Sequence, residues 1–150
     1  MKRLLRIFLL SIACCGVLTA CESSADELAI QASIESMQNA IEQHDVELFM
    51  ENIAGDFSGQ FRQDKKRLRN FVQRHLDNNR VIHVYLANQE IEIEGDYAKV
   101  RFNSGLMGGP AQVPERGQLY IVETDWVRLK GNWKMQRAQW RPKLFVINPG

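Results

Sequence analysis

The residues that could carry out chemistry are few and are spread along the chain. His44, His75 and His83 are the only histidines, and no His-x-x-x-His or paired-cysteine spacing accompanies them. Metal sites in proteins gather several such ligands, so we predict none here. There is no Gly-x-Ser-x-Gly motif, and Gly108-Gly109-Pro110 is not followed by Lys-Ser or Lys-Thr. We therefore predict no nucleophilic enzyme, no phosphate-binding loop and no cofactor.

The first twenty residues have the pattern of an export signal. Lys2, Arg3 and Arg6 are followed by an uncharged, mostly apolar stretch, Ile7–Ala20. This order of charge and hydrophobicity is typical of a secretory signal peptide. Because the stretch is shorter than the roughly 20 residues that a membrane-spanning helix needs, we expect the segment to be cleaved off.

The end of this segment, Leu18-Thr19-Ala20-Cys21, resembles the lipobox of bacterial lipoproteins. The resemblance implies cleavage before Cys21, lipidation of Cys21 and attachment to a membrane through that lipid. The alternative is an ordinary signal peptide cleaved after Ala20, which would leave a free thiol. Cys14 and Cys15 leave with the signal in either case, so the mature chain cannot form an internal disulfide.

Charge and length limit what the mature chain can be. Without the three basic residues of the signal it has 16 basic and 18 acidic residues, a net charge of −2, which does not favour nucleic acid as a partner. In proteobacterial lipoproteins an Asp after the lipidated Cys commonly signals inner-membrane retention. Because Glu22 stands there, we expect the outer membrane, facing the periplasm. We predict a signal at 1–20, a lipidated Cys and tether at 21–24, and one domain at 25–150.

Apolar residues recur with helical period in the first half of the chain. We predict a helix over about Ala25–Gln43, a second that Asp45 caps and that ends near Gly55, and a third that Asp64 caps. The segment Asp56–Gly59 between the last two is predicted to be an irregular link.

From Val81 the period changes to two, which predicts strands in two long hairpins. The first turns at Gly95-Asp96, and the second at a three-residue loop, Lys130–Asn132. The expected pairs are Glu92 with Lys99, Glu90 with Arg101, Ile91 with Val100, Ile93 with Ala98, Leu129 with Trp133, Val127 with Met135, and Asp125 with Arg137. Farther from each turn the apolar parity reverses, which predicts bulged strands. Gly105–Gly117 is predicted to be a mobile loop and Leu144–Ile147 a short edge strand.

These elements predict an α+β domain in which three N-terminal helices pack on a strongly curved antiparallel sheet of two long hairpins. Together with Ile41–Phe49 at the first helix junction and Gly131–Met135 in the last turn, the arrangement resembles the nuclear transport factor two-like superfamily. The resemblance covers about Ala25–Lys143. It implies the cone-shaped fold of ketosteroid isomerases and polyketide cyclases, a fold that also hosts binding and dimerisation domains.

The resemblance also allows candidate catalytic residues to be grouped. Ketosteroid isomerases carry an oxyanion-hole Tyr on the first helix, where this chain has none. The remaining acid–base candidates are Asp56, His83, Tyr85, Glu123 and Asp125. Each has a structural alternative: a turn residue for Asp56, exposed strand positions for His83 and Tyr85, and a cross-strand ion pair with Arg137 for Asp125.

Aromatic and basic residues supply two further hypotheses. Tyr120, Trp126 and Trp140 concentrate on the second hairpin and could line a pocket for an apolar ligand, with ordinary core packing as the alternative. Basic residues of the third helix form either a solvated face or a surface for anionic lipid head groups; these are Arg62, Lys65, Lys66, Arg67, Arg69 and Arg74. His75, on the apolar face of that helix, is expected to be a core histidine.

The sequence thus favours a non-catalytic, membrane-anchored envelope lipoprotein that binds a small apolar ligand or another envelope component. The alternatives are a small-molecule isomerase or lyase that uses the same cavity, and a homodimeric scaffold with the outer sheet face as its interface.

Overall fold

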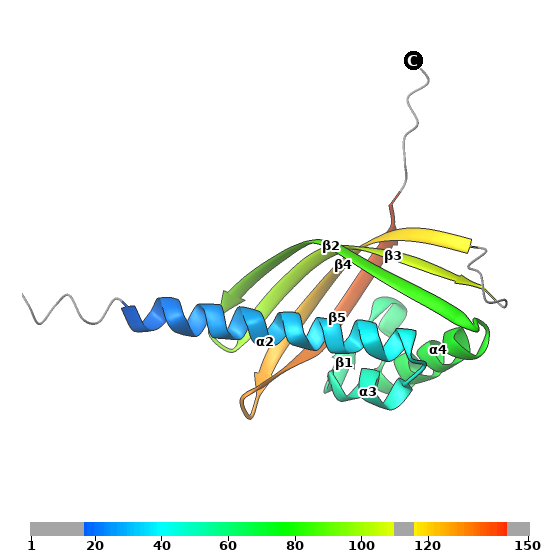
Figure 1. Cartoon of the computed structure of the whole chain (residues 1–150). Coiled ribbons are helices and arrows are strands. Elements are labelled where there is room, and N and C mark those ends of the chain that lie inside the picture. The colour runs from blue at the N-terminus through cyan, green and yellow to red at the C-terminus, as the bar shows by residue number, and fades with distance from the viewer. Residues whose placement is uncertain (1–16, 110–115, 144–150) are drawn as a thin grey trace, which may run out of the picture.

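The computed structural model of the chain describes residues 17–109 and 116–143. The three helices lie on the concave side of a strongly curved sheet (Figure 1). This confirms the predicted α+β architecture. In chain order the elements are α2 (Val17–Glu42), α3 (Val46–Glu51), β1 (Ile53–Ser58), the 3-10 turn η1 (Gln60–Arg62), α4 (Lys65–Asp77), β2 (Val81–Glu94), β3 (Tyr97–Gly109), β4 (Arg116–Leu129) and β5 (Asn132–Pro142).

The helix starts follow from side-chain caps, with one exception. Asp45 accepts a hydrogen bond from the amide of Leu48 at 2.9 Å, and Asp64 accepts one from the amide of Arg67 at 2.8 Å, as the sequence predicted. The first helix instead begins at Val17, well before the expected Ala25. Cys21 therefore lies on the N-terminal part of α2.

The sheet contains a strand that the sequence analysis missed. The strand order is β1-β5-β4-β3-β2, with β1 parallel to β5 and all other neighbours antiparallel. The predicted irregular link is wrong, because Ile53–Ser58 forms β1. The burial of Ile53, Ala54 and Phe57 does not alternate, so a search for period two could not find this strand. The sheet is consequently mixed, and α3 stops at Glu51 instead of near Gly55.

The first hairpin has the predicted register. All four expected pairs form around the Gly95-Asp96 turn. A register shift between Ala87 and Glu90, where Asn88 takes a left-handed φ of 55°, reverses the parity of β2. The bulge turns Val84 on one side of it and Ile91 on the other toward the helices, as the reversed apolar pattern predicted.

The second hairpin corrects the predicted turn. Leu129 pairs with Asn132 and Arg128 with Trp133, so the loop is the two-residue Lys130-Gly131, both with positive φ. A bulge between Asp125 and Trp126 then restores the predicted pair Asp125–Arg137. The pairs Val127–Met135 and Leu129–Trp133 were wrong. The cause is Arg128, which takes an inward-facing position that the apolar pattern assigned to its neighbours.

The predicted loop between the hairpins is shorter than expected. β3 continues to Gly109 and β4 starts at Arg116, so much of Gly105–Gly117 is strand. Residues 110–115 and the predicted edge strand Leu144–Ile147 lie outside the described residues. No helix in the described part of the chain is long and apolar enough to cross a membrane.

Candidate functional site

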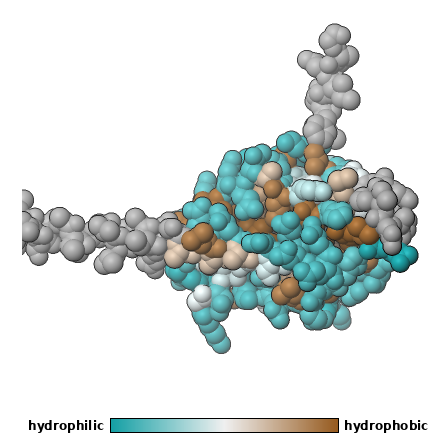
Figure 2. Space-filling model, in the orientation of Figure 1, coloured by the Kyte–Doolittle hydropathy of each residue, from teal (hydrophilic) through white to brown (hydrophobic). Residues whose placement is uncertain are grey.

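A cavity of about 750 Å³ lies between the inner face of the sheet and the helices α2 and α4. This volume falls within the roughly 300–1,000 Å³ range of small-molecule sites. Apolar side chains from every layer line it; they include Met37, Ile41, Phe71, Leu76, Phe102 and Met135. In Figure 2 apolar residues, in brown, show along the line where α2 passes beneath β2, within a mostly hydrophilic face.

All three aromatic residues predicted to bind ligand line this cavity. Tyr120 and Trp140 are half-buried, whereas Trp126 is only 1% exposed. The indole N–H of Trp126 donates to the hydroxyl of Thr124 at 2.8 Å, so its polar atom is satisfied inside the protein. Trp126 therefore forms a fixed wall, while the other two rings retain accessible surface.

Strand geometry explains why these residues share one face. From Gln118 to Trp126 every second residue of β4 lines the cavity, and these include Tyr120, Thr124 and Trp126. On β5 the bulge shifts the parity, so that Met135 and Trp140 both face inward despite their odd separation. The sequence signal for the pocket was this change of parity among aromatic residues.

The five acid–base candidates are placed elsewhere. None of them is among the residues that line the cavity. The side chains of His83 and Tyr85 lie on the exposed face of β2, whereas that of Val84 between them is buried. Tyr85 is 59% exposed. Asp56 is exposed on β1 and accepts a hydrogen bond from the side-chain amide of Gln136 at 2.7 Å.

The two acidic candidates of β4 form ion pairs across the sheet. Glu123 lies 3.9 Å from the guanidinium of Arg101, and Asp125 lies 3.9 Å from that of Arg137. All four side chains are more than two-fifths exposed, so the pairs add little to stability. For Asp125 this is the structural alternative that its sequence position suggested.

The titratable residues that do line the cavity are His75 and Tyr120. The imidazole of His75 packs edge-on against Phe71, with ring centroids 4.4 Å apart, and the residue is exposed. The expectation of a core histidine was therefore wrong. The amide of Gln38, which also lines the cavity, donates to the carbonyl of Val84 at 2.7 Å. The cavity thus offers one imidazole, one phenol and uncharged polar groups.

Charged residues with shifted pKa values lie outside the cavity. A hydrogen bond from Arg69 lowers the pKa of Glu47 at the α3–α4 contact. Burial lowers the pKa of Lys65, and the positive charges of Lys134 and Arg69 lower it further. The ammonium of Lys65 donates to the carbonyl of Ile53 at 2.6 Å, which ties α4 to β1. Within the described ranges, no three His, Cys, Asp or Glu side chains are grouped so as to hold a metal ion.

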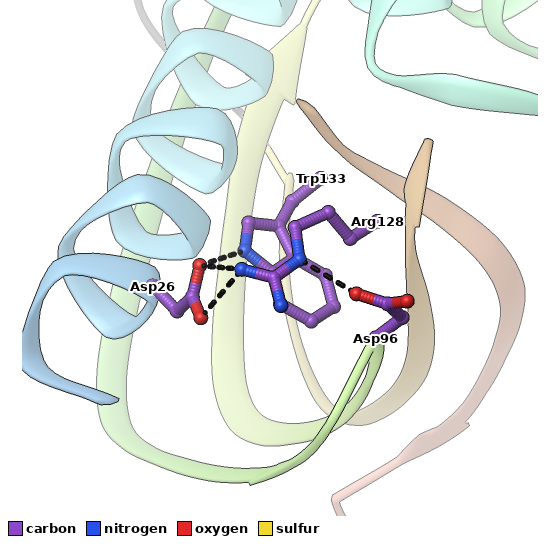
Figure 3. Close-up of polar contacts among 4 residues, drawn as sticks. All are labelled: Asp26, Asp96, Arg128 and Trp133. Carbon is purple, nitrogen blue, oxygen red and sulfur yellow. Dashed lines mark hydrogen bonds and ion pairs between the residues drawn. The ribbon is translucent and has the colours of Figure 1, made fainter. Parts of the chain in front are cut away.

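A polar cluster outside the cavity lining joins α2 to the ends of the hairpins (Figure 3). Arg128 donates to both carboxylate oxygens of Asp26 at 2.9 Å and to Asp96 at 2.8 Å, and its guanidinium lies 5.4 Å from the centre of the Trp133 ring. Trp133 in turn donates from its indole N–H to Asp26 at 3.0 Å. We call these four residues the Arg128 clamp. Sequence reasoning missed it because its members lie far apart in the chain, in α2, β4, β5 and the turn between β2 and β3.

Comparison with solved structures shows the fold. A protein of unknown function from Mycobacterium tuberculosis superimposes with a TM-score of 0.75 at 19% identity, over 87% of this chain and 79% of that one. A proposed dehydratase of the NTF2-like family from Streptomyces avermitilis gives 0.73 at 17% identity, over 82% and 99%. A type 2 hexachlorocyclohexane dehydrochlorinase gives 0.71 at 12% identity, over 85% and 91%.

Sequence comparison shows the family. Among curated proteins no sequence matches this chain. The SnoaL-like domain family matches residues 22–139, which include α3, α4, strands β1 to β4 and most of α2 and β5. The chain therefore belongs to the SnoaL-like domain family.

Proposed function

We propose that this protein is a membrane-anchored envelope lipoprotein whose domain binds a small apolar ligand without transforming it. The observation that carries the proposal is the cavity. Its walls are mainly aliphatic and aromatic, and the five acid–base candidates lie away from it. Such a lining stabilises a ligand chiefly by removing apolar surface from water, and it offers few groups for proton transfer.

The anchoring part of the proposal rests on sequence. Leu18–Cys21 has the order of residues of a lipobox, and the family match begins at residue 22, directly after Cys21. We place the protein in the outer membrane, facing the periplasm, because Glu22 follows the lipidated residue. Cys21→Ser is expected to abolish acyl labelling and release the protein from membranes. A variant that matures normally and stays membrane-bound would contradict the anchor.

Ligand binding can be tested with a neutral fluorescent probe, N-phenylnaphthylamine, on the full-length chain in nanodiscs. Energy transfer from Trp126, Trp133 and Trp140 reports probe near the domain, and probe dissolved in the lipid gives a background that is common to all variants. Leu106→Asp puts a charge into the cavity lining, whereas Leu119→Asp puts the same charge on the neighbouring strand outside it. The two leucines are 38% and 37% exposed, so the variants are well matched.

Saturable energy transfer in the parent and in Leu119→Asp, with strong loss in Leu106→Asp, is the expected result. Equal signals in the two variants would show that the probe does not occupy the cavity.

A second candidate function is a small-molecule isomerase or lyase. The observation that favours it is that His75 and Tyr120 both line the cavity, because imidazole is the side chain best suited to proton transfer near neutral pH. His75→Gln and Tyr120→Phe separate the two functions. Retained binding of neutral ligands by both variants, with no ligand turned over by the parent, supports the carrier.

A homodimer through the outer sheet face is a third proposal. Tyr85 and Leu119 expose apolar surface on that side of the sheet, outside the cavity lining. Sedimentation of the parent and of Tyr85→Glu in detergent tests it, since a buried glutamate would dissociate the dimer.

A further inference from the structure

A second hollow of about 520 Å³ adjoins the cavity on the α4 side. Its lining differs in chemistry from that of the cavity. It consists of Gln60, Phe61, Gln63, Arg67, Asn70, Phe71, Arg74 and Trp140, and so includes two arginines, three amide side chains and three aromatic rings. None of these residues is acidic. The hollow is therefore suited to an anion.

The two arginines are available for a ligand. Arg67, Asn70 and Arg74 recur at helical spacing on one face of α4. On the same helix Arg69 is paired with Glu47. By contrast, no ion pair joins Arg67 or Arg74 to any carboxylate within residues 17–109 and 116–143. Two forked guanidinium groups without partners match the oxygens of a carboxylate or a phosphate.

The hollow and the cavity share a boundary. Phe71 and Trp140 line both, with ring centroids 6.0 Å apart. The amide of Gln60 donates to the carbonyl of Trp140 at 2.6 Å, which fixes η1 against β5 at this point. A molecule with its apolar part in the cavity against these two rings would therefore have its polar end near the arginines that line the hollow.

Phe61 supplies an independent observation at the rim of the hollow. Its side chain is 95% exposed, and its backbone is left-handed, with φ 55° and ψ 33°, as is that of Arg62 with φ 58°. Bulky residues seldom adopt this conformation, and holding one there costs free energy. A strained aromatic side chain that contacts little of the protein is placed to pack on a ligand.

We propose that the natural ligand is an anionic amphiphile, with an acyl or similarly apolar body in the cavity and a carboxylate or phosphate head on Arg67 and Arg74. This inference rests on the proposed function and names its ligand class. The head-group site makes the domain prefer an anionic ligand to a neutral ligand of similar shape. The apolar cavity alone cannot provide this preference.

Displacement of N-phenylnaphthylamine from the full-length chain in phosphatidylcholine nanodiscs tests the proposal. The competitors are octanol, octanoate, octyl phosphate and inorganic phosphate, which share or lack the apolar chain and the charged head. The double variant Arg67→Gln/Arg74→Gln removes the head-group site. Lys66→Gln/Arg80→Gln removes the same charge from exposed positions that line neither hollow. Partition of each competitor into the lipid is common to all variants.

The parent and the control variant are expected to bind at least one of the two anions about tenfold more tightly than octanol, a preference that falls as salt rises. The Arg67→Gln/Arg74→Gln variant should lose this preference and still bind octanol. Whichever of octanoate and octyl phosphate binds more tightly identifies the head. Equal affinity for octanol and both anions in the parent would overturn this inference and leave the proposed function standing. Displacement by inorganic phosphate alone would also overturn it, and no binding by any competitor or probe would overturn both.

Discussion

The helices pack on the curved sheet in opposite ways at the two ends of the domain. At the end where the hairpins turn, the Arg128 clamp fills the space with hydrogen bonds and leaves Arg128 only 25% and Asp26 15% exposed. At the other end the same sheet and the same helix α2 enclose the apolar cavity. Trp133 and Trp140 lie on the same strand, one at each end. The strand supplies rigidity at one end and accessible aromatic surface at the other.

This difference separates stability from function. Nε and Nη1 of Arg128 and the indole N–H of Trp133 all donate to carboxylates of the protein, so the clamp fixes where α2 meets the sheet. Several cavity-lining residues, such as Trp126 and Met135, also belong to the hydrophobic core. Half-buried members of the lining, such as Trp140, lack packing partners on the cavity side and therefore contribute less to folding. We infer that the clamp holds the cone together so that the cavity can remain open.

The largest effect is expected for Trp133→Ala. Trp133 is 3% exposed, contacts Arg128 and donates to Asp26, so its removal leaves a void and takes one hydrogen bond from the Asp26 carboxylate. We expect a loss of about 3–5 kcal/mol in the free energy of unfolding. Urea unfolding of the full-length chain in detergent measures it. A loss below that of Trp140→Ala would contradict the division between the two ends.

Arg128→Gln is expected to rank second. Glutamine cannot reach both carboxylates, and Asp26 would lose its main cationic partner while remaining largely buried. The expected loss is roughly 1.5–3 kcal/mol, the usual range for charged hydrogen bonds that are not fully buried. The same unfolding experiment applies, with Arg101→Gln as the control because its ion pair is exposed. Equal losses for the two variants would show that the Arg128 clamp stabilises the fold no more than an exposed ion pair does.

Trp140→Ala tests the stability of the domain at its cavity end. The ring already faces the cavity and the adjoining hollow, so its removal should cost less than roughly 2 kcal/mol, below the range of large core truncations. Probe binding should fall strongly in the same variant. A core-sized loss of stability, with no probe binding in the parent, would show that the interior is packed solid.

Asp96→Asn is expected to have the smallest effect. Its carboxylate is 66% exposed, and such pairs contribute about 1 kcal/mol or less. Removing the charge of Asp96 should therefore change stability far less than changing Arg128. Adding salt should reduce the difference further, whereas a salt-independent loss as large as that of Arg128→Gln would place Asp96 at the centre of the clamp.

The sequence predicted those parts of the fold that depend on local pattern. The caps Asp45 and Asp64 and the register around Gly95 were confirmed because each is determined by residues close together in the chain. β1 was missed because its parallel pairing with β5 joins residues some eighty positions apart, and the two-residue turn at Lys130 was missed because Arg128 faces inward. The inward position of Arg128 depends in turn on Asp26, which lies about a hundred positions earlier in the chain. Neither feature can be inferred from residues that are close together in the sequence.

For the candidate site the same distinction holds. The aromatic residues of the second hairpin could be assigned to the cavity because strand parity is a local property. The acid–base candidates were grouped from the fold alone, and the sheet turns them outward. His75 was taken for a core residue because its position on the apolar face of α4 does not reveal that this face borders an open cavity.

The central claim is that a neutral apolar ligand enters the cavity and not the rest of the core. Methionine methyl NMR of the full-length chain tests this directly, because Met37, Met107 and Met135 line the cavity and Met50 lies in the core outside its lining. On addition of octanol we predict saturable shifts of the first three signals while Met50 stays unchanged. Unchanged signals for all four, or shifts of Met50 as large as those of Met37 and Met135, would contradict the account.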